Sequence, residues 1–183
     1  MPPDDNAIGL GEAISRASAF LLRLDPGPLA RLRRMAVNGP SETAFWQLAG
    51  KCGFLADFQE DKWLQLVKIM AILTPKGDPA NRGRLHQSEY AFGTALCDGA
   101  QPGWSGEIPF FSERRLARFL TLPFARRGEA LEGMARMLAA NRTPNSGINC
   151  LDIACLLFSD DVKHTRKLAS TYYKRLDSTR NPK

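Results

Sequence analysis

The sequence EDKWLQLVKIMAIL, residues 60–73, has the spacing of apolar side chains that indicates a buried α-helix. Its apolar residues recur at intervals of three and four and so form one broad hydrophobic face; they are Trp63, Leu66, Val67, Met70, Ala71 and Leu73. Glu60 or Asp61 begins the predicted helix. The helix ends before Pro75, because proline lacks a backbone donor and disfavours helical geometry in the preceding residue. We expect this helix to lie in the core.

Helical spacing continues in both directions from this segment, and no alternating run rich in β-branched residues indicates a strand. Upstream, the spacing predicts helices over residues 7–24, 28–36 and 41–51, with Ser41 as a cap of the third. Downstream, it predicts helices over residues 88–97, 112–120, 128–140, 148–158 and 162–176, with Ser88 as a cap of the first. The predicted fold class is therefore all-α.

With 183 residues, of which 44% are hydrophobic, the chain is long enough for one compact domain or two small lobes. Residues 76–87, KGDPANRGRLHQ, place two glycines and a proline among charged side chains, as linkers and long surface loops do. We therefore predict an N-terminal helical lobe over residues 1–78, a basic interlobe loop over residues 79–87 and a C-terminal helical lobe over residues 88–183.

Positive charge is concentrated in three segments. The chain has 25 lysines and arginines against 19 acidic residues, a net charge of +6. The excess lies in residues 31–40, 111–142 and 162–183, whereas residues 1–30 and 143–161 are net acidic. Clustered positive charge favours an anionic partner, most often nucleic acid or an acidic membrane surface. The alternative is a chain that is basic without such a partner.

The segment SERRLARFL, residues 112–120, combines a face suited to burial with a cationic face. At about 100° per residue, Arg114, Arg115 and Arg118 fall in one sector of a helix. The opposite sector contains Leu116, Ala117 and Leu120, with Phe119 near the boundary. Guanidinium groups spaced by a helical turn can contact successive phosphates of a polyanion. The alternative is an ordinary solvated helix face.

Further arginines lie in loops and near helix ends, where they can reach phosphates without occupying core positions. They are Arg33 and Arg34 before a loop, Arg82 and Arg84 in the interlobe loop, Arg126 and Arg127 after Pro123, and Arg136 in the next predicted helix. With the three arginines of residues 112–120, they are the candidate nucleic-acid contacts. Solvation also explains each of them when it is taken alone.

No sequence pattern supports an enzyme or a metal centre. The chain lacks the GxxxxGK[ST], GxGxxG, HExxH and GxSxG motifs. His86 and His164 have no neighbouring His or Cys, and packing in the core explains Cys150 and Cys155 more simply than metal ligation. An N-cap for the last helix explains residues 160–161, two aspartates, better than a nuclease carboxylate pair. We predict a non-enzymatic protein without a cofactor or a metal.

The sequence also predicts a reduced, cytoplasmic protein. Its four cysteines form no CxxC pair, and residues 1–5, MPPDD, lack the charged and apolar regions of a signal peptide. The longest apolar runs, such as residues 153–158, are far shorter than the roughly 20 residues that a membrane-spanning helix needs.

Three segments of the chain form a recognisable order. They are Leu32-Arg33-Arg34, then Phe92-Gly93-Thr94-Ala95-Leu96 followed by the arginines of residues 112–120, and finally Leu168-Ala169-Ser170-Thr171-Tyr172-Tyr173. Over most of residues 28–175 the chain resembles the CasB family, the small subunit of the type I-E CRISPR surveillance complex Cascade. Thr94, Leu168 and Ser170 depart from the family, which often has arginine at the first position and tryptophan and arginine at the other two.

The resemblance implies an all-helical, two-lobed, non-catalytic subunit that is present in two copies beside the backbone subunits holding the guide RNA. Such a subunit binds the DNA backbone, chiefly of the displaced non-target strand, and stabilises the R-loop, since backbone contacts tip a nearly balanced strand exchange. Arg34, Arg114, Arg115 and Arg136 match arginines of the family.

The partners implied in this way are the backbone and large subunits of Cascade, the guide RNA, target DNA and a second copy of the chain, with no membrane. One alternative is a scaffolding module that contacts protein or guide RNA and not DNA. Another is an independent nuclease or nucleotide-modifying enzyme.

Overall fold

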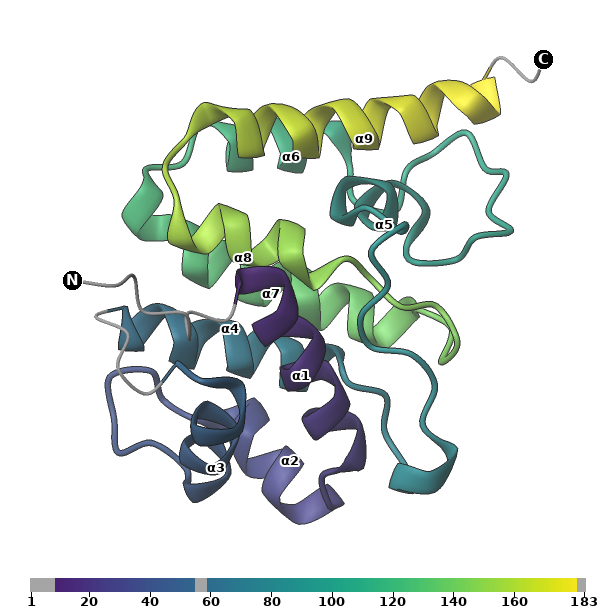
Figure 1. Cartoon of the computed structure of the whole chain (residues 1–183). Helices are drawn as coiled ribbons and strands as arrows, with labels where there is room; N and C mark the ends of the chain where they lie inside the picture. The colour runs from purple at the N-terminus through teal and green to yellow at the C-terminus, as the bar shows by residue number, and fades with distance from the viewer. Residues whose placement is uncertain (1–8, 55–58, 181–183) are drawn as a thin grey trace.

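The computed structural model describes residues 9–54 and 59–180, and every regular element within these ranges is a helix (Figure 1). The elements are α1 (Leu10–Arg23), α2 (Pro26–Arg34), α3 (Thr43–Cys52), α4 (Glu60–Leu73), η1 (Pro79–Asn81), α5 (Phe92–Asp98), α6 (Glu113–Leu120), η2 (Phe124–Arg126), α7 (Arg127–Asn141), α8 (Cys150–Phe158) and α9 (Val162–Arg180). The predicted all-α class is confirmed. None of the helices in the described ranges is both long enough and apolar enough to cross a lipid bilayer.

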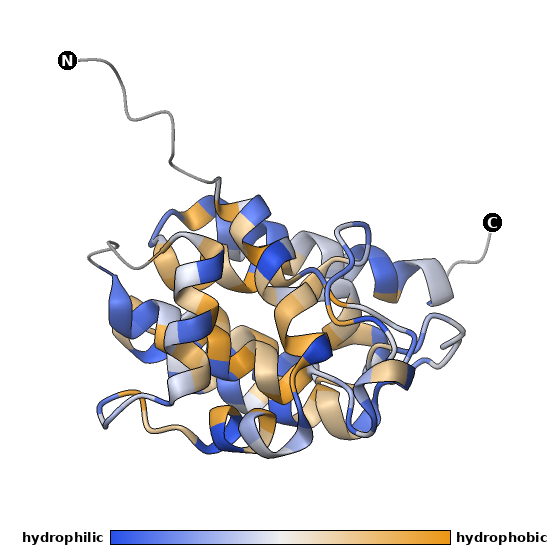
Figure 2. Ribbon diagram, turned by 60° about the horizontal axis from the view of Figure 1, so that its bottom comes forward, coloured by the Kyte–Doolittle hydropathy of each residue, from blue (hydrophilic) through white to orange (hydrophobic). Residues whose placement is uncertain are grey.

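Helix α4 is the centre of the packing, as its apolar spacing predicts. It packs against α7, α2, α8 and α1. Most of its residues are buried, including Leu66, Ile69 and Met70, none of which has exposed surface. Trp63 stacks on Phe54 at 4.0 Å and meets the edge of Phe158 at 4.8 Å, which joins α4 to α8. In Figure 2 the hydrophobic residues accordingly gather between the helices and the hydrophilic ones lie outside.

Helices α5 and α9 pack closely on each other. The contact needs glycine at position 93, because a Cβ there would lie 2.2 Å from the backbone oxygen of Leu168. The buried Tyr172 donates its hydroxyl to the Phe111 oxygen at 2.6 Å, which ties α9 to the loop before α6. Two of the three segments used in the resemblance, residues 92–96 and 168–173, therefore meet in this one contact.

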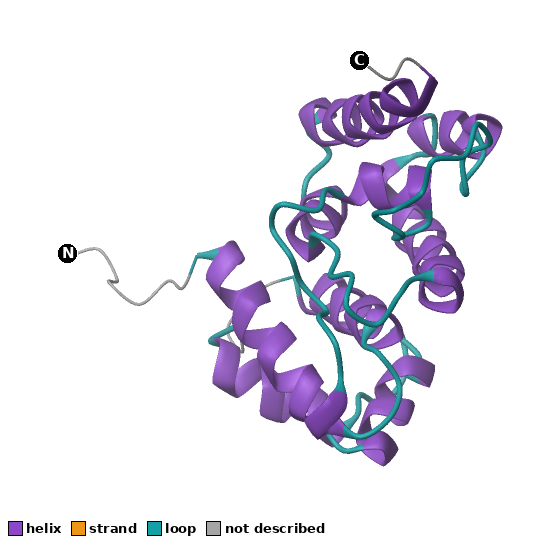
Figure 3. Ribbon diagram, turned by 90° about the vertical axis from the view of Figure 1, so that its right-hand side faces the viewer, coloured by secondary structure: helices purple, strands orange, loops and turns teal. Residues whose placement is uncertain are grey.

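The predicted division into two lobes is not confirmed. A single continuous cluster of buried apolar side chains contains residues from both sides of the predicted interlobe loop. Helix α4, from the first predicted lobe, packs on α7 and α8 from the second. The connection between α4 and α5 runs along one side of the molecule, as Figure 3 shows in its loop colour, and Arg82 fastens it to α1.

The helix predicted from Ser88 begins instead at Phe92. Backbone groups of residues 85–90 bond to residues 148–149: the Ile148 amide donates to the Leu85 oxygen at 2.9 Å, and the Asn149 amide donates to the Tyr90 oxygen at 2.8 Å. The Tyr90 amide also donates to the Gln87 oxygen at 3.1 Å, so residues 87–90 form a turn that is fixed to residues 148–149, and the helix begins only after it. The pairing is long-range, and helical periodicity does not reveal it. Similarly, α3 begins at Thr43 and Ser41 does not cap it.

Candidate nucleic-acid interface

Helix α6 presents the three predicted arginines to solvent. Arg114, Arg115 and Arg118 are all exposed, whereas Leu116 and Phe119 are buried. Two details of the prediction are wrong: Phe119 belongs to the core, with 2% of its surface exposed, and Ala117 is exposed. Residues three apart lie on the same side of a helix, so Leu116 and Phe119 form a narrow buried stripe, and Ala117 lies beside it.

A groove of about 300 Å³ separates α6 from α7. Arg115 and Arg118 line its α6 side, and no acidic residue lines it. Its remaining lining is apolar: Phe111, Phe119, Leu122, Ala130, Gly133, Met134 and Met137. Arg115 extends toward α7, where its Nη1 lies 3.9 Å from the sulfur of Met137.

A second groove, of about 400 Å³, lies on the other side of α7, against α2 and the end of α4. Four cationic residues and no acidic residue line it: Arg33, Arg34, Lys76 and Arg136. Ala30, Ile72, Ala139 and Ala140 complete the lining. Three arginines predicted from two separate sequence segments therefore converge here. Lys76 was not predicted, because one lysine in a charged loop carries no distinguishing signal.

The two grooves are neighbours on the surface of α7. Arg136 lines one and Met137, the next residue along the chain, lines the other. At about 100° per residue, the ridge between them is formed by Gly133, which lines the groove beside α6, and Ala140, which lines the groove beside α2; neither has a bulky side chain, so the ridge is low. In Figure 1, α6 and α2 accordingly lie on opposite sides of α7.

We call the five cations that line these grooves with exposed side chains the α7 cationic surface: Arg34, Lys76, Arg115, Arg118 and Arg136.

Most cations of this surface have no competing carboxylate. Arg34, Lys76 and Arg118 form no ion pair with any residue of 9–54 or 59–180. Arg136 pairs with Glu132 at 2.8 Å but keeps 53% of its side chain exposed. Toward the start of α7 the surface ends, since Glu129 lies on the same ridge and pairs there with Arg126 at 3.7 Å.

Glu132 is held as a carboxylate beneath the surface. Burial raises its pKa, but hydrogen bonds from Arg136, Gln65 and Lys68 outweigh burial, and the net shift is downward. Lys68 lies 3.1 Å and Gln65 lies 3.2 Å from the same carboxylate oxygen. Glu132 therefore keeps two polar partners on α4 when Arg136 turns toward a ligand.

Two predicted contacts, Arg33 and Arg82, are engaged inside the molecule. Arg33 donates Nε to the Ala71 oxygen at 2.8 Å and Nη2 to the Thr74 oxygen at 2.7 Å. Burial, followed by repulsion from Arg82, lowers the pKa of Arg33. Each helix ends with carbonyl groups that lack intrahelical donors, and an arginine satisfies them well. Arg33 serves the end of α4 in this way.

Arg82 performs the same role for α1. Its Nη1 donates to the oxygens of Leu21, Leu22 and Leu24 at 3.1, 3.1 and 2.6 Å, and its Nη2 donates to the Gly77 oxygen at 3.1 Å. Burial, the largest cause, lowers its pKa. We therefore leave Arg33 and Arg82 out of the proposed contacts.

The remaining predicted arginines lie away from the two grooves. Arg127 is buried, pairs with Asp160 at 2.9 Å and lies 5.3 Å from the Phe124 ring, so it links the start of α7 to the loop before α9. Arg126 is exposed beside Glu129. Arg84 is exposed, and its backbone oxygen accepts a hydrogen bond from Arg142. Arg114 is exposed on α6 and lines neither of the two grooves.

A third basic groove was not predicted. It lies between α1 and α3, has a volume of about 400 Å³, and is lined by Arg16, Arg23 and Lys51 with Phe20 and two smaller apolar residues. Glu12 pairs with Arg16 at 2.6 Å, and Lys51 lies over the Phe20 ring at 5.1 Å. Both contacts reduce the charge that is free for a ligand. Residues 1–30 are net acidic, which concealed this groove in the sequence.

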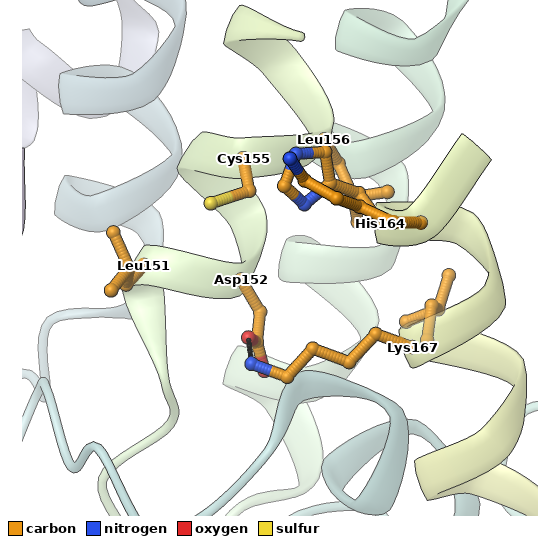
Figure 4. Close-up of a pocket in the computed structure, with 8 residues that line it drawn as sticks. Leu151, Asp152, Cys155, Leu156, His164 and Lys167 are labelled. Atoms are coloured by element: carbon orange, nitrogen blue, oxygen red, sulfur yellow. Dashed lines mark hydrogen bonds and ion pairs between the residues drawn. The ribbon is translucent and has the colours of Figure 1, made fainter. Parts of the chain in front are cut away.

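The pocket between α8 and α9 holds several reactive residue types, but they do not form a relay. Asp152 accepts hydrogen bonds from Lys167 at 2.6 Å and from the Phe92 amide at 3.0 Å. Burial raises the pKa of Cys155, which favours the thiol over the thiolate. Figure 4 shows its sulfur pointing away from the imidazole of His164. Across residues 9–54 and 59–180, no three His, Cys, Asp or Glu side chains converge as a metal site requires.

Residues 160–161 have structural roles, as the sequence predicted. Asp161 accepts a hydrogen bond from the Lys163 amide at 2.9 Å and so caps α9, and Asp160 pairs with Arg127. His86 is likewise structural: its Nδ1 accepts from the Cys150 amide at 3.1 Å at the start of α8.

Comparisons of the chain with protein families, with curated proteins and with solved structures find no match.

Proposed function

We propose that this chain binds the sugar-phosphate backbone of DNA through the α7 cationic surface, as a non-catalytic small subunit of a type I-E CRISPR Cascade complex. In that role it stabilises the R-loop and the displaced non-target strand in the cytoplasm. Its partners are the backbone and large subunits, the guide RNA, target DNA and a second copy of itself.

One observation carries the proposal. Arginines from α2, α6 and α7, far apart in sequence, line two adjoining grooves that no acidic residue lines. Charges that serve only solubility have no reason to converge. An extended polyanion that crosses α7 would meet cations on both sides of a low ridge, which suits backbone contacts without base readout.

The assignment to Cascade rests on the order of the three resembling segments. The α5–α9 contact explains two of them physically, since the glycine in residues 92–96 admits the backbone of residues 168–173. This packing gives both segments a structural reason within this chain. Arg34, Arg115 and Arg136, three of the four arginines matched to the family, line the grooves.

Salt-dependent binding of single-stranded DNA tests the electrostatic part. If the five cations neutralise five phosphates, the logarithm of the binding constant should fall against the logarithm of salt concentration with a slope of about −3.5. Replacing Arg34 and Arg136 by alanine should reduce that slope by about 1.4 and weaken binding at low salt.

The matched control replaces Arg166 and Lys174, two exposed cations of α9, by alanine. This variant loses the same charge and should keep the slope of the wild type. Equal weakening in both variants would show that net charge alone drives binding, which would contradict a localised surface.

Reconstitution tests the assembly. The chain, expressed with the other subunits and the guide RNA of a type I-E complex that lacks its own small subunit, should co-purify and lengthen the lifetime of the R-loop. Co-purification without any crosslink between the α7 cationic surface and photoreactive target DNA would support the scaffolding alternative. Metal-dependent turnover of DNA by the isolated chain would support an enzyme.

A further inference from the structure

We infer that the groove between α6 and α7 receives a nucleobase of the bound strand, so that the chain binds single strands in preference to duplex. The inference rests on the proposed function, because it assumes that a nucleic acid follows the α7 cationic surface. It adds a binding site for bases to a surface otherwise suited to phosphates.

The apolar lining of this groove is not explained by phosphate binding. The groove beside α2 is lined by four cations, whereas the groove beside α6 is lined by two exposed arginines and otherwise by apolar residues, among them phenylalanine, leucine and methionine. Leu122 and Met137 are half-buried and keep apolar surface open to solvent. Contact with this apolar surface does not stabilise a bound phosphate, whereas it removes the apolar face of a base from water and so favours binding.

The chemistry of the lining suits a flat aromatic group. Met134 and Met137 both line the groove, and a methionine sulfur makes favourable contacts with aromatic rings. Arg115, whose Nη1 lies 3.9 Å from the Met137 sulfur, brings a planar guanidinium to the groove, and arginine planes stack on bases. No residue that lines the groove offers a side-chain acceptor other than these sulfurs, so we expect little discrimination among bases.

Charge and size favour a strand over a protein segment. Arg115 and Arg118 line the groove from α6, Arg136 follows on the next face of α7, and these cations would hold the phosphates on either side of an inserted base. The groove holds about 300 Å³, near the lower limit for small-molecule sites, which suits a single flat group. Duplex DNA keeps its bases stacked inside and cannot fill the groove.

Gly133 provides a test that does not threaten folding. It is an exposed residue in the middle of α7 and lines the groove. No atom lies within 4 Å of the position that a Cβ would take. Gly133→Leu therefore fills the groove without a backbone clash, and leucine is the better helix former. Ala117→Leu is the matched control, because it adds leucine to an exposed position of α6 outside the groove.

The experiment compares oligothymidylate with an abasic strand of the same length, by fluorescence anisotropy at one salt concentration. We expect the wild-type chain and Ala117→Leu to bind oligothymidylate about tenfold more tightly than the abasic strand, as one stacked base predicts. Gly133→Leu should lose this preference and keep its affinity for the abasic strand, since all five cations remain.

Three results would overturn the inference. Equal wild-type affinity for the two strands would exclude base insertion and leave backbone binding intact. An unchanged preference in Gly133→Leu would place the base elsewhere. The groove would be assigned to a protein partner if the wild type bound the two strands equally and also bound an acidic leucine-containing peptide that Gly133→Leu does not bind. Failure of the wild type to bind either strand would contradict the proposed function itself.

Discussion

Replacing Arg175 by methionine is expected to remove about 3–5 kcal/mol from the free energy of unfolding. Arg175 on α9 donates Nε to Asp98 Oδ2 at 2.9 Å and Nη2 to the oxygens of Pro102 and Trp104 at 3.0 and 2.8 Å. The Asp98 side chain is 0% exposed and that of Arg175 is 19% exposed. One guanidinium therefore joins α9, the end of α5 and the loop between α5 and α6.

The magnitude follows from what the substitution leaves behind. Asp98 Oδ1 keeps two donors, the Tyr90 hydroxyl at 2.7 Å and the Ala100 amide at 3.1 Å. Oδ2 loses its arginine and remains buried without a cation, and removal of one partner from a buried pair costs about 3–5 kcal/mol. Methionine keeps much of the aliphatic volume, so the loss measures the polar contacts.

Urea unfolding followed by circular dichroism measures the change, and the melting temperature should fall by roughly 6–20 °C. Lys174→Met, at the neighbouring exposed position, is the control and should change stability by less than about 0.5 kcal/mol. A double-mutant cycle with Asp98→Asn separates the ion pair from the two carbonyl contacts. A loss below about 1 kcal/mol in Arg175→Met would refute the reasoning, because it would mean that water solvates Asp98.

Two further predictions concern titratable side chains. Burial lowers the pKa of His86, so the unfolded chain binds a proton more readily than the folded chain, and the free energy of unfolding should fall as the pH drops below about 6.5. Urea titrations at several pH values should show this dependence reduced in His86→Gln, and an unchanged dependence would assign it to other groups. Cys155 alone among the four cysteines is not buried, so a maleimide should label one thiol of the folded chain faster than the other three, although the raised pKa of Cys155 slows that reaction, and this faster labelling should be absent in Cys155→Ser. Burial raises the pKa of Cys52 and Cys97 to about 11 and that of Cys150 to about 12, so labelling of a second thiol at the rate of Cys155 would show that one of these three is not buried in the core.

The sequence predicted the positions of helices correctly where the burial of a side chain depends on residues close to it along the chain. The apolar spacing of residues 60–73 predicted a core helix, and α4 has those bounds. The start of α5 did not follow, because residues 85–90 bond to residues 148–149 and form a turn before the helix begins. The two-lobe division relied on the composition of residues 76–87, which marks a loop but cannot show whether helices on its two sides share a core.

The sequence predicted that arginines form the candidate interface, but it did not predict which arginines belong to it. Charge clustering and loop position nominated ten arginines without distinguishing one that faces solvent from one that faces a carbonyl. Arg33 and Arg34 are adjacent in sequence, yet the first bonds to the end of α4 and the second lines a groove with an exposed side chain. The two side chains point about 100° apart around α2. This difference gives them different roles only because α4 packs on one side of α2.

Periodicity and charge thus established the helical class, the core helix α4 and the exposed arginine face of α6, because each depends on residues within a few turns of one another. Tertiary packing alone brought Arg34, Lys76 and Arg136 into one groove and placed an apolar groove beside Arg115 and Arg118. It also assigned Arg82 to α1, across some 60 residues of chain. Those outcomes depend on which helix ends lie near which side chains, and helix packing determines this after the local structure has formed.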